Sequence, residues 1–357
     1  MHGLAPLRSM MVEISRLFAF DKGQWLAVCL SVLLVACGGG GGSSVDTRLS
    51  GNFLDSAVAG LTYQTNTQLG TTNESGLFRY YPGETVAFYI QGMYVGEASG
   101  ASMLSPTLIA PAGSHSDYAS NLLRLLQTMD SDQNPSNGIV LGALTNTLNV
   151  NLRQMLDSSS ASFASSWTSA NMTANPLVST SDAMVHFVDT LFNEMQKTVA
   201  SISTTSIDLT GRTATATMMF DSGTCTNGVS TSWNLVFGVN SATLTGSGID
   251  PLTCQAIAQS AWTQSLEYVD RPSTNTTSGT NVTLRSNALF LPCGAVCTEG
   301  LLNQAYSGVD TGADDNRPFD AKVVHMPGTR DIYMVKTFTD ASSIKPRTIY
   351  YHTVISP

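Results

Sequence analysis

The segment from residue 25 to residue 48 determines where this chain can begin to fold. Residues 25–36 form an apolar run that ends at Cys37, and five consecutive glycines at positions 38–42 follow it. The run is too short to span a bilayer comfortably as a permanent helix, since spanning takes about 20 apolar residues. Glycine has no side chain that packs into a core, so the glycines form a flexible tether. A folded body therefore begins after residue 48.

Three basic residues, Arg8, Arg16 and Lys22, precede the apolar run. A basic segment before an apolar run of this length is the pattern of a secretory signal peptide. The run closes with Leu34-Val35-Ala36-Cys37, which resembles the lipobox of bacterial lipoproteins. This resemblance implies that residues 1–36 are removed, that Cys37 is acylated with palmitate-type chains, and that residues 37–48 tether the body to the membrane. A conventional signal peptide or a short membrane anchor is the alternative.

The residue after Cys37 bears on which membrane holds the protein. Several acyl chains on one cysteine give stable anchoring, unlike a single myristoyl group. Gly38 stands where inner-membrane lipoproteins have aspartate, so resemblance to the usual sorting rule implies the cell outer membrane. The sequence is compatible with anchoring in either leaflet of that membrane.

Composition and charge exclude some partners. The chain has 357 residues, 42% of them hydrophobic, which is enough to bury a core. Only 12% are charged, against roughly 25% in average soluble proteins, and this is typical of exported β-rich proteins. Removal of residues 1–36 leaves 14 basic and 24 acidic residues, a net charge of −10. We expect such a body to repel nucleic acid and anionic headgroups.

Short apolar runs separated by turn signals predict an antiparallel β-sandwich over residues 49–110. The turns contain Asn73-Glu74-Ser75-Gly76 and Pro82-Gly83-Glu84. The predicted strands are residues 49–53, 58–64, 77–81, 86–90 and 93–95. Residues 53–61 followed by 70–78 resemble the transthyretin-like (carboxypeptidase regulatory-like) sandwiches of bacterial surface proteins. That resemblance implies a stalk or an interaction module.

A helical segment is predicted over residues 111–200. One apolar stripe contains Tyr118, Leu122, Leu125, Leu126 and Met129, and a second contains Met184, Phe187, Val188, Leu191, Phe192 and Met195. Ser181 is a suitable N-cap for the second helix. Residues 121–139 also resemble a segment that often follows such sandwiches in surface lipoproteins.

Residues 201–357 are predicted to form a C-terminal β-rich domain that contains disulfides. The predicted strands are residues 213–220, 232–237, 242–245, 282–291, 332–338 and 349–355. The last two strands should form a hairpin, and residues 254–269 should form one helix. The fold class is therefore mainly β, with a small helical segment of short amphipathic helices between the sandwich and the C-terminal domain.

Four cysteines remain after processing and acylation: Cys225, Cys254, Cys293 and Cys297. An even number in an oxidising compartment predicts two disulfides. Chain order favours pairing Cys225 with Cys254 and Cys293 with Cys297, although two other pairings are possible. A zinc site or a redox pair is disfavoured, because the one short spacing has three intervening residues.

One spacing resembles a metal site. Asp130, Asp132 and Asn134 place oxygen side chains at alternate positions, as the first three ligands of an EF-hand calcium loop do. Pro135 and Leu141 stand where that loop needs its glycine and its glutamate, so only a weak calcium site is predicted. The alternative is a solvated turn at the end of a helix. Calcium is the only cofactor for which the sequence gives any indication. A second oxygen-rich cluster, Asp310, Asp314, Asp315, Asn316 and Asp320, is interpreted first as a turn and second as a site for calcium or carbohydrate.

No catalytic motif was found, whether a nucleophile elbow, a zinc helix, a phosphate loop or a dinucleotide fingerprint. His186 is expected to be structural, and His325 and His352 lie in or beside strands without an evident nucleophile. The leading hypothesis is a membrane-anchored envelope lipoprotein that acts as a surface binding or structural module, with an envelope protein or glycan as partner. The alternatives are an envelope glycan or peptide hydrolase with its site in the C-terminal domain, and an assembly factor of an outer-membrane complex.

Overall fold

The computed structural model describes most of the chain after the tether. The described residues are 46–145, 151–198, 205–222, 229–246, 249–250, 255–256, 262–268, 280–284, 290–291, 293–310, 316–340 and 346–357. Cys37, the predicted acylation site, and the cysteines Cys225 and Cys254 lie outside them. The fold is mainly β with a small helical segment, as predicted.

Two small sheets form the N-terminal sandwich. One sheet has the order β5-β1-β8 and the other β4-β3-β6-β7. Their bounds are β1 Leu49–Phe53, β3 Thr62–Gln64, β4 Leu69–Thr71, β5 Leu77–Tyr80, β6 Thr85–Ile90, β7 Met93–Ser99 and β8 Met103–Leu104. Aromatic rings from both sheets meet in the core, with 4.7 Å between the ring centroids of Phe53 and Phe88 and 5.4 Å between those of Phe78 and Phe88. The predicted sandwich is confirmed, although β8 runs parallel to β1 rather than antiparallel.

The run expected as one strand over residues 58–64 is two strands. β2 (Val58–Ala59) pairs in parallel with β9 (Ile139–Val140), whereas β3 belongs to the four-stranded sheet. Gly60 separates them with a φ of +96°, a backbone conformation that side chains with a Cβ rarely adopt. The break directs residues 58–59 toward the segment that follows the first long helix.

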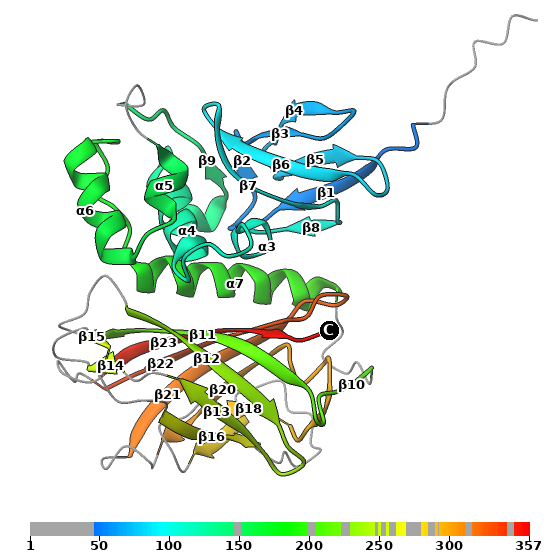
Figure 1. The fold of residues 1–357 in the computed structure, drawn as a ribbon, viewed down its shortest axis with the longest axis vertical. Coiled ribbons are helices and arrows are strands. Elements are labelled where there is room, and N and C mark those ends of the chain that lie inside the picture. The colour runs from blue at the N-terminus through cyan, green and yellow to red at the C-terminus, as the bar shows by residue number, and fades with distance from the viewer. Residues whose placement is uncertain are drawn as a thin grey trace, which may run out of the picture. The chain divides into compact units, whose positions relative to one another are not determined.

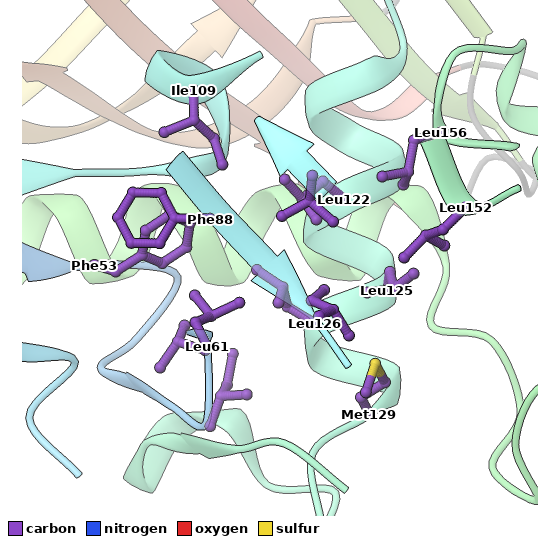
Figure 2. Close-up of a cluster of buried hydrophobic side chains, with 14 of the residues drawn as sticks. Phe53, Leu61, Phe88, Ile109, Leu122, Leu125, Leu126, Met129, Leu152 and Leu156 are labelled. Carbon is purple, nitrogen blue, oxygen red and sulfur yellow. The ribbon is translucent and has the colours of Figure 1, made fainter. Parts of the chain in front are cut away.

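The helices are α3 Pro106–Ile109, α4 Tyr118–Thr128, the 3₁₀ turn η1 Pro135–Asn137, α5 Leu152–Leu156, α6 Ser160–Ala170 and α7 Thr180–Thr198. The predicted stripe of α4 is buried from Tyr118 to Met129. Figure 2 shows Leu122 and Leu126 of this helix on the side of Phe53 and Phe88, whereas Leu125 lies on the side of Leu152. The sandwich and helices α4 to α6 therefore share one hydrophobic core.

Helix α7 packs with the C-terminal sheet (Figure 1). Its buried residues Met184, Phe187, Val188, Leu191 and Met195 join a second cluster that includes Tyr333 and Tyr350 of the sheet. The ring centroids of Phe187 and Tyr333 lie 5.6 Å apart with the rings nearly perpendicular. Leu123 of α4 belongs to the same cluster, so α7 is held by the first long helix and by the sheet together.

A curled ten-stranded sheet forms most of the C-terminal part, in the order β17-β20-β21-β22-β23-β11-β12-β13-β16-β18. Its strands are β11 Thr213–Ser222, β12 Val229–Phe237, β13 Ser241–Gly246, β16 Trp262–Tyr268, β17 Thr280–Leu284, β18 Phe290–Leu291, β20 Gln304–Asp310, β21 Arg317–His325, β22 Asp331–Phe338 and β23 Pro346–Ile355. Shorter strands outside it are β10 Ser206–Asp208, β14 Ile249–Asp250, β15 Gln255–Ala256 and β19 Val296–Thr298.

Three sequence predictions for this part have clear outcomes. The terminal hairpin is confirmed, because β22 and β23 pair antiparallel from Asp331 opposite Val354 to Thr337 opposite Thr348. The helix expected over residues 254–269 is wrong, since this stretch contains β15 and β16, and β16 pairs with β13. The disulfide between Cys293 and Cys297 is present.

Candidate functional site

A polar pocket of about 370 Å³ lies where three segments of the chain meet. Its walls are the turn around Ser56, the loop around Asn137 and the polar side of α7. The lining residues are Ser56, Ala57, Ser136, Asn137, Gly138, His186, Asp189, Thr190, Asn193, Glu194 and Lys197. The volume lies within the ~300–1,000 Å³ typical of small-molecule pockets.

The first wall is a tight turn around Ser56 that is stabilised by a side chain of α4. Leu54 and Ala57 form a β-bridge across it, and Ser56 has a φ of +64°. A residue with a Cβ adopts this left-handed conformation only where its surroundings impose it. Gln127 of α4 supplies part of that constraint, because its Nε2 donates to Oδ1 of the neighbouring Asp55 at 2.9 Å. Complete burial raises the pKa of the Asp55 carboxyl well above its usual range.

The second wall is the loop that follows α4, and two carboxylates hold its shape. Asp130 accepts hydrogen bonds from the backbone amides of Asn134 and Val140, both at 2.9 Å. Asp132 accepts from the amide of Asn134 and from Nδ2 of Asn137, also at 2.9 Å. The loop thereby presents the carbonyl of Pro135, which accepts a 2.5 Å hydrogen bond from the Ser56 hydroxyl.

These bonds bear on the calcium prediction for Asp130, Asp132 and Asn134. All four carboxylate oxygens of the two aspartates accept hydrogen bonds from the loop itself, which is the arrangement of a carboxylate-stabilised turn. Among the described residues, no group of three or more His, Cys, Asp or Glu is placed to hold a metal ion. The calcium site stays a prediction, and the observed bonds support its alternative.

The third wall is the exposed side of α7. His186 Nε2 lies 3.0 Å from the Ser56 hydroxyl oxygen, and the hydroxyl of Thr190, one turn later, lies 3.4 Å from the same nitrogen. Burial lowers the pKa of His186, while a hydrogen bond with the backbone of Asp55 and the charge of Asp189 oppose that shift in part. Burial thus favours the neutral form of the imidazole. Besides the structural role expected for it, His186 also lines the pocket with its ring.

The charged side chains at the rim are paired with each other. Asp189 forms an ion pair with Lys322 of β21 at 2.6 Å, and Glu194 forms one with Lys197 within α7. The pocket combines hydroxyl and amide groups with compensated charges, which suits hydrogen bonding to a neutral polar molecule.

The two C-terminal histidines do not meet. His325 lies opposite Ile332, whereas His352 lies opposite Tyr333, and neighbouring residues of a strand point to opposite faces of the sheet. His352 Nε2 is 2.7 Å from Asp331 Oδ1, and its ring stacks on Tyr333 with 4.5 Å between centroids. A hydrolase in this domain would need a histidine beside a carboxylate at a cleft. His352 has Asp331 beside it, but neither histidine lines the pocket described above.

One member of the oxygen-rich cluster, Asp310, has neither of the two roles predicted for the cluster. Asp310 is fully buried at the end of β20, where its Oδ2 accepts a 2.6 Å hydrogen bond from the equally buried Nζ of Lys336. The Lys336 ammonium lies over the rings of Phe319 and Phe338, at 4.4 and 4.7 Å from their centroids. Asp314 and Asp315 lie outside the described residues. Asp310 therefore belongs to the interior of the sheet and not to a solvated turn.

Sequence reasoning missed Ser56 and Thr190. Ser56 and His186 are separated by 130 positions, and only the fold brings them together. The available local signal was Asn137-Gly138, which marks the turn that forms one wall. No protein-family model matches this chain, and neither a curated protein nor a solved structure matches it significantly.

Proposed function

We propose that this protein is a lipid-anchored module of the bacterial outer membrane that binds a small polar ligand through the pocket at Ser56 and His186. The anchor rests on the sequence, namely the signal-like residues 1–36, the lipobox-like Cys37 and the glycine tether. In the described part of the chain, no helix is long and apolar enough to cross a bilayer. We assign attachment to the membrane to acyl chains on Cys37, on the basis of the lipobox resemblance.

The observation that carries the binding function is the preorganisation of the pocket. Each wall is fixed by hydrogen bonds that do not involve a ligand: Gln127 fixes the turn, Asp130 fixes the loop, and Lys322 fixes Asp189 on α7. A pocket whose polar groups are already in place spends little conformational entropy when it binds. Binding pockets are usually preformed in this way.

The test is cosedimentation of the processed protein with purified peptidoglycan sacculi, an insoluble envelope glycan. Asn193→Trp places an indole at the mouth of the pocket from an exposed position of α7, so we expect it to reduce the bound fraction strongly. Ser166→Trp is the matched control, because it adds the same side chain to an exposed position of α6, away from the pocket. Equal binding by the two variants would place the ligand elsewhere, and no binding by the unaltered protein would remove the proposal for this envelope component.

A further inference from the structure

The charge balance of the pocket restricts its ligand. The carboxylate of Asp189 already has the ammonium of Lys322 at 2.6 Å, and Glu194 and Lys197 form a pair on the same helix. An anionic ligand would have to compete with the carboxylates for these ammonium groups, and a cationic ligand would have to compete with the lysines. A neutral ligand has neither cost, so the rim favours uncharged molecules.

The hydrogen-bonding groups restrict it further. The hydroxyl of Ser56 has one proton and two acceptors within reach, the carbonyl of Pro135 at 2.5 Å and His186 Nε2 at 3.0 Å. The hydroxyl of Thr190 lies 3.5 Å from the Ser56 oxygen and can act as donor or acceptor. The His186 ring already bonds to the backbone of Asp55, and its Nε2 faces the hydroxyls of Ser56 and Thr190. This cluster is completed by a group that donates and accepts at once, which a hydroxyl does and which neither an ammonium nor a carboxylate does.

The amide side chains nearby extend the same chemistry. Asn137 Nδ2 donates to Asp132 at 2.9 Å, which fixes the orientation of the amide, and Asn193 lies on the exposed side of α7. No Phe, Tyr or Trp stands among the lining residues. Affinity would therefore rest on hydrogen bonds without ring stacking, and a single site should be weak, on the order of 1 mM. Many tethered copies on one membrane would raise the avidity for a polymer.

We infer that the pocket binds one uncharged, hydroxyl-rich sugar residue of an envelope glycan, with the hydroxyls of Ser56 and Thr190 and the imidazole of His186 contacting a single sugar hydroxyl. This inference rests on the proposed binding function and names the ligand class for the same site. It makes Thr190 a specificity residue, because loss of its hydroxyl leaves the sugar hydroxyl with one partner fewer.

The test uses ligand-observed NMR titration of the processed protein with glucose, galactose and N-acetylglucosamine, and with acetate and methylammonium as charged probes of similar polarity. We expect at least one sugar to bind in the millimolar range and neither ion to do so. Thr190→Val, which is nearly isosteric, should weaken sugar binding roughly tenfold. Thr168→Val is the matched control, because this threonine lies on the exposed surface of α6 and bonds only to its own helix.

The outcomes separate the ligand class from the proposed function. Binding of acetate or methylammonium but of no sugar would overturn the sugar inference, and so would sugar binding that Thr190→Val leaves unchanged. If no sugar binds but Asn193→Trp still abolishes sedimentation with sacculi, the ligand class is wrong and the binding function stands. If both experiments are negative, both proposals fall.

Discussion

At the scale of single residues, several charged and polar side chains lie where apolar ones would be expected. Asp310 and Lys336 are fully buried as an ion pair, and Arg317, which is 3% exposed, forms an ion pair with Asp340. Breaking such a pair by removing one partner typically costs ~3–5 kcal/mol, because the remaining charge stays uncompensated. The first pair therefore links β20 to β22 across β21, and the second links β21 to the segment after β22, at positions that tolerate little change.

His325 provides a residue-scale prediction about pH. It is 4% exposed, burial lowers its pKa, and its Nδ1 has no hydrogen-bond partner among the described residues. Below about pH 6.5 the unfolded chain takes up a proton that the folded state resists. The stability that neutral His325 contributes is therefore present at neutral pH and is lost as the pH falls below about 6.5.

We expect the difference in free energy of unfolding between the unaltered protein and His325→Gln to shrink between pH 7 and pH 5, as measured by urea denaturation. The variant is the necessary reference because other groups titrate too. Asp55, whose pKa is raised, has the opposite sign, since its contribution is present at low pH and is lost as the pH rises. A difference that stays constant over this range would show that His325 titrates normally.

At the scale of secondary-structure elements, the loop between α4 and β9 is stabilised by its own carboxylates and also forms one wall of the pocket. Its carboxylates Asp130 and Asp132 accept the amides that shape it, and the resulting turn delivers the Pro135 carbonyl to Ser56. The same loop carries the residues from which a calcium site was predicted. A purely structural loop and a calcium-binding loop differ in how calcium should affect the stability of variants at Asp130.

Asp130→Ala should lower the free energy of unfolding by about 1–3 kcal/mol, because the backbone amides of Asn134 and Val140 both lose the buried carboxylate that accepts their hydrogen bonds. If the carboxylate acts on the loop directly, the loss is the same in chelator and in millimolar calcium. The measurement is thermal or urea unfolding under the two conditions, with calorimetric titration of calcium into the chelator-treated protein. A loss seen only with calcium, or calcium heat that disappears in Asp130→Ala/Asp132→Ala, would establish the cation site.

Elements with regular apolar spacing were predictable from the sequence. The stripe from Tyr118 to Met129 gave α4, and the alternation in residues 349–355 gave most of β23. Residues 262–268 form β16, but in the sequence the apolar residues just before them imitate a helix face, which led to the wrong helix prediction. Strands β20 and β21 were not predicted. In β20, Ser307 and Gly308 weaken the apolar pattern, whereas in β21 the alternation of Phe319, Ala321 and Val323 was present in the sequence.

The pocket was beyond sequence reasoning for a different physical reason. Its walls come from segments near positions 56, 137 and 190, and no local pattern specifies that these segments converge. Convergence depends on Gly60 turning β2 toward β9 and on α7 packing between α4 and the sheet. Both are consequences of tertiary packing.

At the scale of the whole molecule, residues Arg48–Pro357 form one compact unit. The sandwich and α4 share one core, and α4, α7 and the sheet share another. Hydrogen bonds also link the two halves, as between Thr107 and the Tyr333 hydroxyl at 2.7 Å. A substitution that destabilises either half should therefore also destabilise the other half.

The lipid anchor gives the prediction at this scale. Cys37→Ser should abolish acylation and processing by the lipoprotein signal peptidase, because only a thiol at this position accepts the diacylglyceryl group. The readouts are incorporation of labelled palmitate and separation of membranes from soluble fractions, with Cys29→Ser, inside the apolar run, as the matched control. A Cys37→Ser protein that still takes up palmitate and sediments with membranes would show that the lipobox interpretation is wrong.

The strand order has a consequence for how the protein is made. β23 lies between β22 and β11, yet residues 346–355 are synthesised more than 120 positions after β11 ends at Ser222. Until that segment emerges, β11 and β22 each have an unpaired edge, and unpaired edges invite aggregation. Such long-range pairing is also slow to form. A nascent chain of this protein should therefore depend on a holding chaperone until its terminal strand arrives.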